Sequence, residues 1–130
     1  MIIGLGTDII EISRIEEQIK HSARLAERIL SPSEYLIFEQ HKYPARYLAK
    51  RFATKEAAVK ALGTGIGRGI SWQQIVISNN LFGQPELSFN GEFAAQCNMR
   101  GVSHSFVSIS DEKHYAVATV ILEANGNRND

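Results

Sequence analysis

Hydrophobic residues in the first half of the chain recur every three or four positions, which is the spacing of one face of an α-helix. They follow a short apolar segment at 2–8 that contains two glycines and favours a buried strand. Glycines inside a strand indicate that another backbone or a ligand approaches closely. The helical spacing then predicts helices at 11–20, 22–29, 31–40 and 44–62.

The second half of the chain changes to short runs that are rich in β-branched residues or alternate with polar ones. Turn-forming residues such as Asn, Gly and Pro separate these runs. The expected elements are strands at 75–77, 86–89, 106–110 and 115–122 and a helix at 90–99. The last two strands flank a short turn at 111–114 and are predicted to form a closing hairpin.

Capping residues indicate where several of these helices begin. Ser31, Pro32 and Glu34 form a capping-box sequence, in which Ser31 caps the helix and Glu34 reaches back to its start. Pro44 suits the first turn of the longest helix, and Asn90 is the expected N-cap of the last one. The predicted helix starts therefore rest on local chemistry as well as on spacing.

The composition is that of one soluble globular domain. The chain has 130 residues, of which 44% are hydrophobic and 22% charged, and its formal net charge is zero. A chain of this size can bury a core without disulfides or metals. Zero net charge gives no reason to expect nucleic-acid binding or a polybasic membrane anchor. We expect residues 1–123 to form a single domain and residues 124–130 to be a polar, disordered tail.

The single cysteine, Cys97, lies among apolar residues in a helical pattern and is interpreted as a packing residue rather than a nucleophile. One cysteine excludes a disulfide within the chain and favours a reducing compartment. The N-terminal segment lacks the features of a signal peptide, and no apolar run reaches transmembrane length. We therefore expect a cytoplasmic protein that does not bind membranes.

Three ionisable residues are candidates for a catalytic or metal site. Asp8 ends the N-terminal apolar strand, and Glu56 and Lys60 lie one turn apart on the helix predicted at 44–62. Two carboxylates can hold Mg²⁺ through oxygen while substrate phosphates fill its other positions. A lysine adds charge for phosphate oxygens that the metal does not reach. Each residue also has a structural interpretation, Asp8 as a helix N-cap and Glu56 with Lys60 as a helix-stabilising pair.

A glycine-rich run, GTGIGRG at 63–69, follows that helix. Alternating glycines can present backbone N–H groups to a phosphate. Phosphate-binding fingerprints precede a helix, however, whereas this run follows one. A helix stop with a turn is therefore the alternative interpretation.

Two long motifs resemble a known family. The run GLGTDIIEISRI at 4–15 resembles the N-terminal signature of the holo-acyl-carrier-protein synthase family, and PARYLAKRFATKEA at 44–57 resembles its central helix. The match continues through GTGI at 63–66, the turn GQP at 83–85 and the C-terminal strands, and it covers residues 1 to about 123. This resemblance implies an α+β fold of the 4′-phosphopantetheinyl transferase type, with an antiparallel sheet packed on a long central helix and with further short helices.

The resemblance also implies an activity. An enzyme of this family transfers the 4′-phosphopantetheine group of coenzyme A to a serine of apo-acyl-carrier protein, in support of fatty acid biosynthesis. It releases adenosine 3′,5′-bisphosphate and requires magnesium. Members of the family are commonly homotrimers with active sites between subunits. The expected partners are therefore coenzyme A, an apo-acyl-carrier protein and further copies of this chain.

Site residues follow from the same resemblance, position by position. Asp8 and Glu56 are the implied magnesium ligands, and Lys60 is the implied contact of the pyrophosphate. Either Glu56 or a water on the metal could accept the serine proton. The resemblance further implies that coenzyme A contacts Lys50, Arg51 and Gly65. It implies that the acidic carrier protein contacts Arg14.

One position departs from the family pattern. Many relatives have histidine directly after the serine-rich end of the penultimate strand, where this chain has Asp111. An acid cannot contact a phosphate as histidine does, so that contact is lost or replaced. His114, three residues on, either compensates or is a plain turn residue, and His104 lies before the predicted strand.

Two other functions remain open from the sequence. A non-catalytic module could bind an acidic partner through Arg14, Arg24 and Arg28, and it would make no product with or without metal. A magnesium-dependent hydrolase of nucleotide pyrophosphates would cleave coenzyme A without a protein acceptor. The chain lacks the dense carboxylate clusters that such hydrolases often use.

Overall fold

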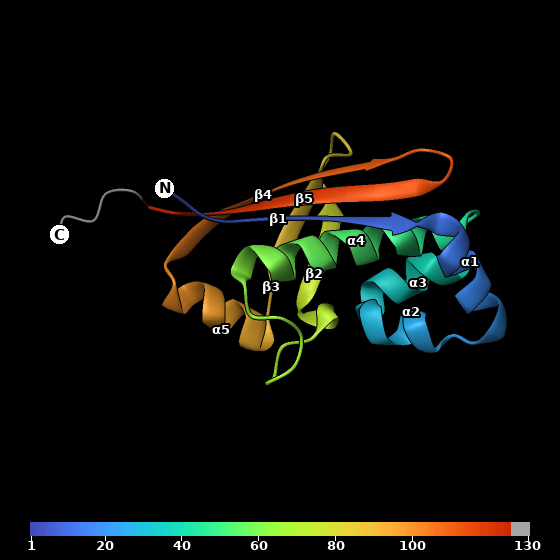
Figure 1. The fold of residues 1–130 in the computed structure, drawn as a ribbon, viewed down its shortest axis with the longest axis horizontal. Helices are drawn as coiled ribbons and strands as arrows, with labels where there is room; N and C mark the ends of the chain where they lie inside the picture. Colours follow the sequence, from blue (N-terminus) through green and yellow to red (C-terminus); the bar gives the residue numbers. More distant parts are fainter. Residues whose placement is uncertain (126–130) are drawn as a thin grey trace.

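A long helix, α4, lies across one face of a three-stranded antiparallel sheet in the computed structural model of the protein (Figure 1). The structure describes residues 1–125. In chain order, the elements are β1 (Ile2–Glu11), α1 (Ile12–His21), α2 (Arg24–Ile29), α3 (Pro32–Gln40), α4 (Pro44–Leu62), the short 3₁₀ helix η1 (Trp72–Gln74), β2 (Ile75–Asn79), β3 (Pro85–Phe89), α5 (Gly91–Met99), β4 (Val102–Asp111) and β5 (Tyr115–Ala124). The expected α+β class, with antiparallel strands on a central helix, is confirmed.

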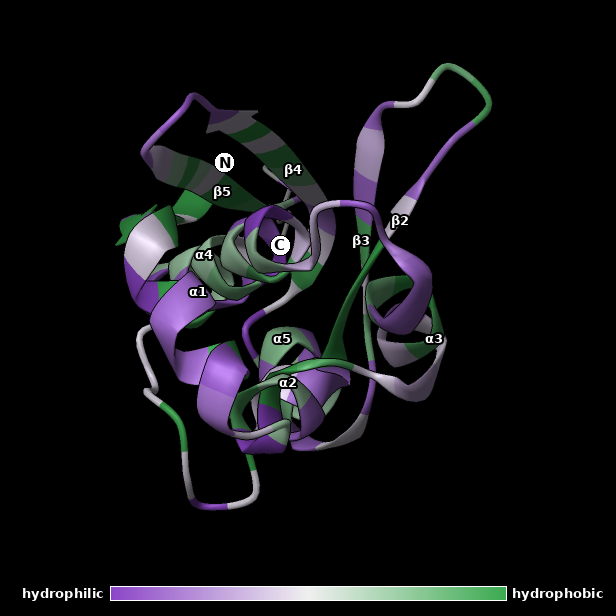
Figure 2. Ribbon diagram, turned by 90° about the vertical axis from the view of Figure 1, so that its right-hand side faces the viewer, coloured by the Kyte–Doolittle hydropathy of each residue, from purple (hydrophilic) through white to green (hydrophobic). Residues whose placement is uncertain are grey.

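The strands form two separate antiparallel sheets. The larger has the order β1-β5-β4, and β2 pairs with β3 as a hairpin. Figure 2, which views α4 nearly along its axis, shows the larger sheet on one side of this helix and other helices and the hairpin around it. Alternate residues of the central strand β5 are buried in the core, as expected for a sheet covered on one face. The core therefore surrounds α4, and α4 positions the residues that it carries.

Two glycines allow β1 to lie directly against α4. A Cβ atom on Gly6 would collide with the carbonyl oxygen of Ala57, and one on Gly4 would collide with that of Ala61. Since both obstacles are helix backbone, they cannot move aside as a flexible side chain would. The close approach that the glycines predicted is confirmed, and it brings β1 next to the C-terminal half of α4.

Gly6→Ala should destabilise the protein by about 1–3 kcal/mol or more, because the added methyl group forces β1 away from α4. Urea unfolding followed by circular dichroism would measure this as a lower midpoint. Thr7→Ser, at the neighbouring position of β1, adds no atom and should change stability by no more than about 0.5 kcal/mol. An unchanged midpoint for Gly6→Ala would contradict the packing of β1 on α4.

β1 and β4 extend well beyond the bounds that the sequence predicted. β1 continues past Asp8 to Glu11, and β4 begins at Val102, because both pair with β5 along these extensions. His104 therefore lies inside β4, opposite Glu123, and not before the strand. These segments lack a strand-like side-chain pattern, and they form strands because their backbones pair with β5.

The predicted capping box of α3 is confirmed, and the predicted cap of α5 is only partly correct. The Ser31 hydroxyl accepts a hydrogen bond from the Glu34 N–H, and the Glu34 carboxylate accepts one from the Ser31 N–H. Asn90 is the N-cap residue of α5, but its side chain makes no capping hydrogen bond. Instead, the side-chain oxygen of Gln74 accepts a hydrogen bond from the Phe93 N–H at 2.9 Å. The side chain that caps α5 thus comes from η1. Capping rules consider only residues next to the helix start, so they do not predict this contact.

Strand β5 ends later than the sequence predicted. β5 extends through Ala124, which the sequence placed in the polar tail. The Ala124 N–H donates to the Met1 carbonyl oxygen, and the Met1 ammonium donates to the Ala124 carbonyl oxygen, both at 2.8 Å. The rest of the predicted tail, from residue 126 on, lies outside the described residues. In the described part of the chain, no helix has the length and apolar character needed to cross a membrane.

Cys97 is buried in the core against the larger sheet and α4. Burial raises the pKa of its thiol to about 11, and the nearby Arg100 offsets only part of this effect. A thiol that stays protonated at neutral pH is a poor nucleophile. The interpretation of Cys97 as a packing residue is therefore supported.

Candidate active site

Asp8 and Lys60 meet at the edge of the interface between β1 and α4. Asp8 lies inside β1, and its side chain is 18% exposed. The Lys60 ammonium donates hydrogen bonds to Asp8 Oδ1 at 3.0 Å and to the Thr7 carbonyl oxygen at 3.1 Å. The interpretation of Asp8 as a helix N-cap is wrong, because β1 runs on to Glu11, which is itself the N-cap residue of α1. The Asp8 carboxylate is thus available to a ligand at this edge.

Glu56 lies one helical turn before Lys60 on α4 and is half-buried. The indole N–H of Trp72 donates a hydrogen bond to Glu56 Oε2 at 2.6 Å. Within residues 1–125, the Glu56 carboxylate has no other hydrogen bond and no ion pair. Lys60 pairs with Asp8 instead, so the interpretation of Glu56 and Lys60 as a helix-stabilising ion pair is wrong.

Trp72 is a neighbour of the site that sequence analysis missed. It lies on η1, three residues after the glycine-rich run that ends at position 69. No spacing rule relates position 72 to position 56, because a loop separates their elements. An aromatic residue that follows a glycine-rich loop is too common to indicate a site.

The donor set at this edge fits magnesium that is shared with a phosphate substrate. In the part of the chain that the structure describes, no three His, Cys, Asp or Glu side chains are grouped so that they could hold a metal. Mg²⁺ is typically held by one or two carboxylates and completes its octahedron with waters and substrate phosphates. Asp8 and Glu56 supply two carboxylates of that kind, and each is partly accessible. The site therefore suits a magnesium–substrate complex better than a closed protein cage.

A second group of charged residues forms around Asp111. Arg46 donates to Asp111 Oδ2 at 2.7 Å, and the Lys50 ammonium lies 3.6 Å from Asp111 Oδ1. Chiefly through the hydrogen bond from Arg46, this group holds the pKa of Asp111 below its ordinary value, although partial burial opposes the shift. Asp111 thus gathers two cations from α4. A phosphate contact at this position would come from those cations and not from residue 111.

Lys50 and Arg51 also line a cavity of about 390 Å³, with Tyr47 and the β2–β3 hairpin as further walls. Arg51 is 8% exposed, and its guanidinium carbon lies 4.8 Å from the centre of the Tyr47 ring. The Tyr47 hydroxyl and the Arg51 Nε are buried and have no hydrogen-bond partner within residues 1–125. Because Tyr47, Lys50 and Arg51 line the cavity, it suits a polar or anionic ligand.

The remaining predicted residues lie apart from both groups. Gly65 is exposed in the loop after α4 and has a φ of 74°, which favours glycine. Arg14 is exposed on α1, where its Nε lies 3.6 Å from Glu11. No described hydrogen bond or ion pair joins either residue to Asp8 or Glu56. The chain therefore brings together Asp8 and Lys60, and Glu56 lies one turn before Lys60 on α4. Lys50 and Arg51 line a separate cavity.

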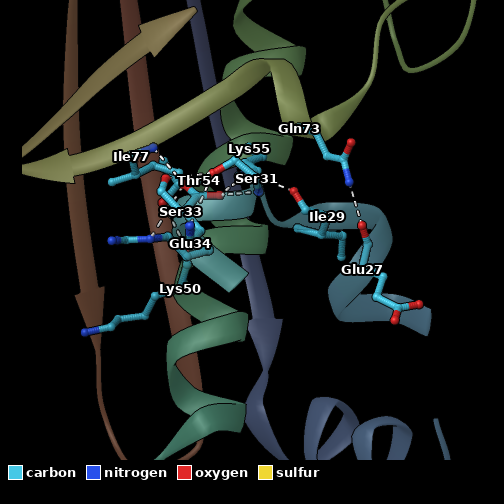
Figure 3. Close-up of polar contacts among 11 residues, drawn as sticks. Glu27, Ile29, Ser31, Ser33, Glu34, Lys50, Thr54, Lys55, Gln73 and Ile77 are labelled. Atoms are coloured by element: carbon cyan, nitrogen blue, oxygen red, sulfur yellow. Dashed lines mark hydrogen bonds and ion pairs between the residues drawn. The ribbon is translucent and has the colours of Figure 1, made fainter. Parts of the chain in front are cut away.

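A buried ion pair fixes α4 on the side away from solvent (Figure 3). Glu34 accepts hydrogen bonds from the Lys55 ammonium at 2.6 Å and from the Ile77 N–H at 2.8 Å. Lys55 is fully buried and also donates to the Ile29 carbonyl oxygen at 2.7 Å. Burial lowers the pKa of Lys55, and the Glu34 carboxylate opposes that shift. The pair joins α2, α3 and β2 to the helix residue that precedes Glu56.

The comparisons with known proteins agree with this fold. The sequence model of the 4′-phosphopantetheinyl transferase superfamily matches residues 4–120, and the chain belongs to that superfamily. Among its relatives is a holo-acyl-carrier-protein synthase from Alteromonas mediterranea. The two are 65% identical over 122 residues, which cover 94% of this chain and 97% of that protein. The family resemblance found in the motifs is confirmed.

Solved structures of such synthases have the same fold. The Neisseria meningitidis holo-acyl-carrier-protein synthase aligns with a TM-score of 0.88 at 41% identity, over 95% of this chain and 99% of that one. The Helicobacter pylori holo-acyl-carrier-protein synthase, solved in complex with coenzyme A, aligns with a TM-score of 0.79 at 31% identity, over 92% of this chain and 99% of that one.

Proposed function

We propose that this protein is a magnesium-dependent synthase that transfers the 4′-phosphopantetheine group of coenzyme A to a serine of apo-acyl-carrier protein, in support of fatty acid biosynthesis. The Alteromonas mediterranea relative is a holo-acyl-carrier-protein synthase, and the Helicobacter pylori neighbour binds coenzyme A. The magnesium role is supported by the placement of two carboxylates. Asp8 contacts Lys60, and Glu56 lies one helical turn before Lys60 on α4.

The transfer forms one P–O bond and breaks another. The serine Oγ of the carrier protein attacks the β-phosphorus of coenzyme A, its proton passes to a base, and the bridging oxygen leaves with adenosine 3′,5′-bisphosphate. When bound, magnesium would neutralise charge that builds up on the pyrophosphate. Lys60 is exposed and flexible enough to turn its ammonium from Asp8 to a phosphate oxygen. The carboxylate of Glu56 is one acceptor for the serine proton.

The cavity lined by Lys50 and Arg51 is the proposed binding place of further coenzyme A phosphates. Its lining includes the Lys50 ammonium and the Arg51 guanidinium, which give it positive charge. Arg46, which already contacts Asp111, adds a third cation close by. Gly65 is proposed to let the cofactor approach the backbone of the loop after α4, and Arg14 to meet the acidic carrier protein.

We further propose a homotrimer in which neighbouring subunits complete each site. The face of the larger sheet that points away from α4 carries exposed apolar side chains, which are Ile3, Leu5, Ile9, Phe106 and Val117. Exposed apolar patches of this kind mark interaction surfaces. No described contact joins the Asp8–Lys60 pair to the Lys50 cavity, so a neighbour would unite the two. Light scattering should give a mass about three times the 14.5 kDa of one chain, and a monomer would contradict the proposal.

The single free thiol of Cys97 supports a cytoplasmic location, because reduced cysteines are the rule there. Cell fractionation with an antibody against the protein would test this location. Recovery of the protein outside the cytoplasmic fraction would contradict it.

Intact mass spectrometry of apo-acyl-carrier protein tests the function directly. After incubation with this protein, coenzyme A and magnesium, the carrier should gain the mass of one phosphopantetheine group. The gain should vanish when EDTA is added and return when magnesium is restored in excess. An unmodified carrier, shown to be competent with another such synthase, would contradict the proposal.

The same samples separate the two alternatives. A hydrolase would release adenosine 3′,5′-bisphosphate from coenzyme A when no carrier protein is present. A binding module that uses Arg14, Arg24 and Arg28 would retain the carrier protein with or without metal and release no nucleotide. The proposed transferase releases the bisphosphate only when coenzyme A, magnesium and apo-carrier are all present.

A further inference from the structure

We infer that Trp72 is a positioning residue for Glu56: its indole N–H fixes one carboxylate oxygen and thereby presents the other to the divalent cation. The donor and acceptor are 2.6 Å apart, which is short for an N–H···O bond. Hydrogen bonds to a carboxylate are stronger than those between neutral groups. This inference rests on the proposed role of Glu56 as a magnesium ligand.

The indole is itself held in place from two sides. The ring of Phe52, which lies one turn before Glu56 on α4, meets the Trp72 ring edge-on at 5.8 Å between centroids and 83° between planes. On the α2 side, the guanidinium carbon of Arg28 lies 5.7 Å from the centre of the Trp72 ring. A hydrogen bond of 2.6 Å from the Gln73 side chain to the Glu27 carbonyl oxygen ties η1 to α2. The N–H donor is therefore fixed in direction before any cation binds.

A fixed donor matters because Glu56 is otherwise free to turn. A glutamate side chain has three rotatable bonds, and Trp72 supplies its single described hydrogen bond. The indole N–H is a donor only, so it can contact the carboxylate but cannot compete with it for a cation. Groups that orient a metal ligand in this way typically change metal affinity roughly 10- to 100-fold when they are removed.

The contact can be observed without any assay of activity. Trp72 is the sole tryptophan of the chain, so the ¹⁵N-labelled protein gives a single indole N–H signal in its NMR spectrum. Glu56→Ala should move this signal upfield, because the carboxylate acceptor is lost. Titration of the wild-type protein with Mg²⁺ in the presence of coenzyme A should shift the same signal with saturation. A signal that ignores both Glu56→Ala and Mg²⁺ would overturn the inference.

Trp72→Phe tests the consequence for the cation. It keeps an aromatic ring against Phe52 and removes the N–H donor. Calorimetry in the presence of coenzyme A should show Mg²⁺ affinity reduced roughly 10-fold or more. The matched control is Tyr43→Phe, which removes one polar group from an exposed aromatic ring that makes no described side-chain hydrogen bond and should leave Mg²⁺ affinity within about twofold of wild type.

The possible outcomes distinguish this inference from the proposed function. If wild-type protein binds Mg²⁺ and Trp72→Phe, shown to be folded by its NMR spectrum, binds it equally well, the positioning role is wrong and the proposed function stands. If wild-type protein binds no Mg²⁺ while the indole signal still responds to Glu56→Ala, the contact is real but the metal role fails, and the inference fails with it.

Discussion

Asp8→Ala and Glu56→Ala should each reduce the rate of phosphopantetheine transfer at least roughly 100-fold, because each removes one of the two carboxylates proposed to hold magnesium. Asp8 also holds the Lys60 ammonium at 3.0 Å, so its loss frees the lysine as well. The rate is measured by intact mass spectrometry of the carrier protein over time. At higher magnesium concentration the loss should become smaller, because weaker binding is partly offset by mass action.

Glu39→Ala is the matched control for these two variants. Glu39 is an exposed helix carboxylate on α3 and takes part in no described hydrogen bond or ion pair, so its removal should leave the rate close to that of wild type. Circular dichroism should show all three variants folded. Full activity of either Asp8→Ala or Glu56→Ala would contradict the assignment of the metal ligands.

Lys55→Ala should lower the free energy of unfolding by about 3–5 kcal/mol, because it leaves the buried carboxylate of Glu34 without its charged partner. Both side chains of this pair are essentially inaccessible, with exposures of 0% for Lys55 and 1% for Glu34. Arg51 is the nearest other cation, but its Nε lies 3.9 Å from Glu34, too far for a hydrogen bond. Urea unfolding followed by circular dichroism would measure the loss.

Lys60→Ala is the control for stability, because it removes a lysine from the same helix at an exposed ion pair. Exposed pairs of this kind contribute about 0–1 kcal/mol. If Lys55→Ala and Lys60→Ala had the same free energy of unfolding, the buried pair would not hold α4 in place. The comparison also separates the two lysines by role, since Lys60 is proposed to act on the substrate.

Sequence reasoning succeeded where the signal is local or where a long motif repeats a family pattern. The capping box at Ser31 and Glu34 lies within four residues, and the structure confirms both of its hydrogen bonds. The glycines at 4 and 6 predicted a close approach, and α4 makes it. The family motifs predicted the α+β class and its central helix correctly.

Contacts between distant segments could not be predicted in the same way. Nothing in the chain pairs Trp72 with Glu56 or Glu34 with Lys55, because each pair is formed only when separate elements pack. The sequence indicates only a capping role for Glu34, yet its carboxylate serves both the cap and the buried ion pair. The extension of β1 past Asp8 depends on pairing with β5. The local sequence does not show this pairing, so Asp8 resembles a helix cap in the sequence.

Binding of Mn²⁺, followed by its electron paramagnetic resonance signal with coenzyme A present, tests most directly whether Asp8 and Glu56 hold the cation. Mn²⁺ suits the same carboxylate and phosphate oxygens as Mg²⁺. We expect about one Mn²⁺ bound per chain, with affinity reduced roughly 10-fold or more in both Asp8→Asn and Glu56→Gln. Equal Mn²⁺ affinity in the wild type and both variants would contradict the assignment of Asp8 and Glu56 as ligands of the cation.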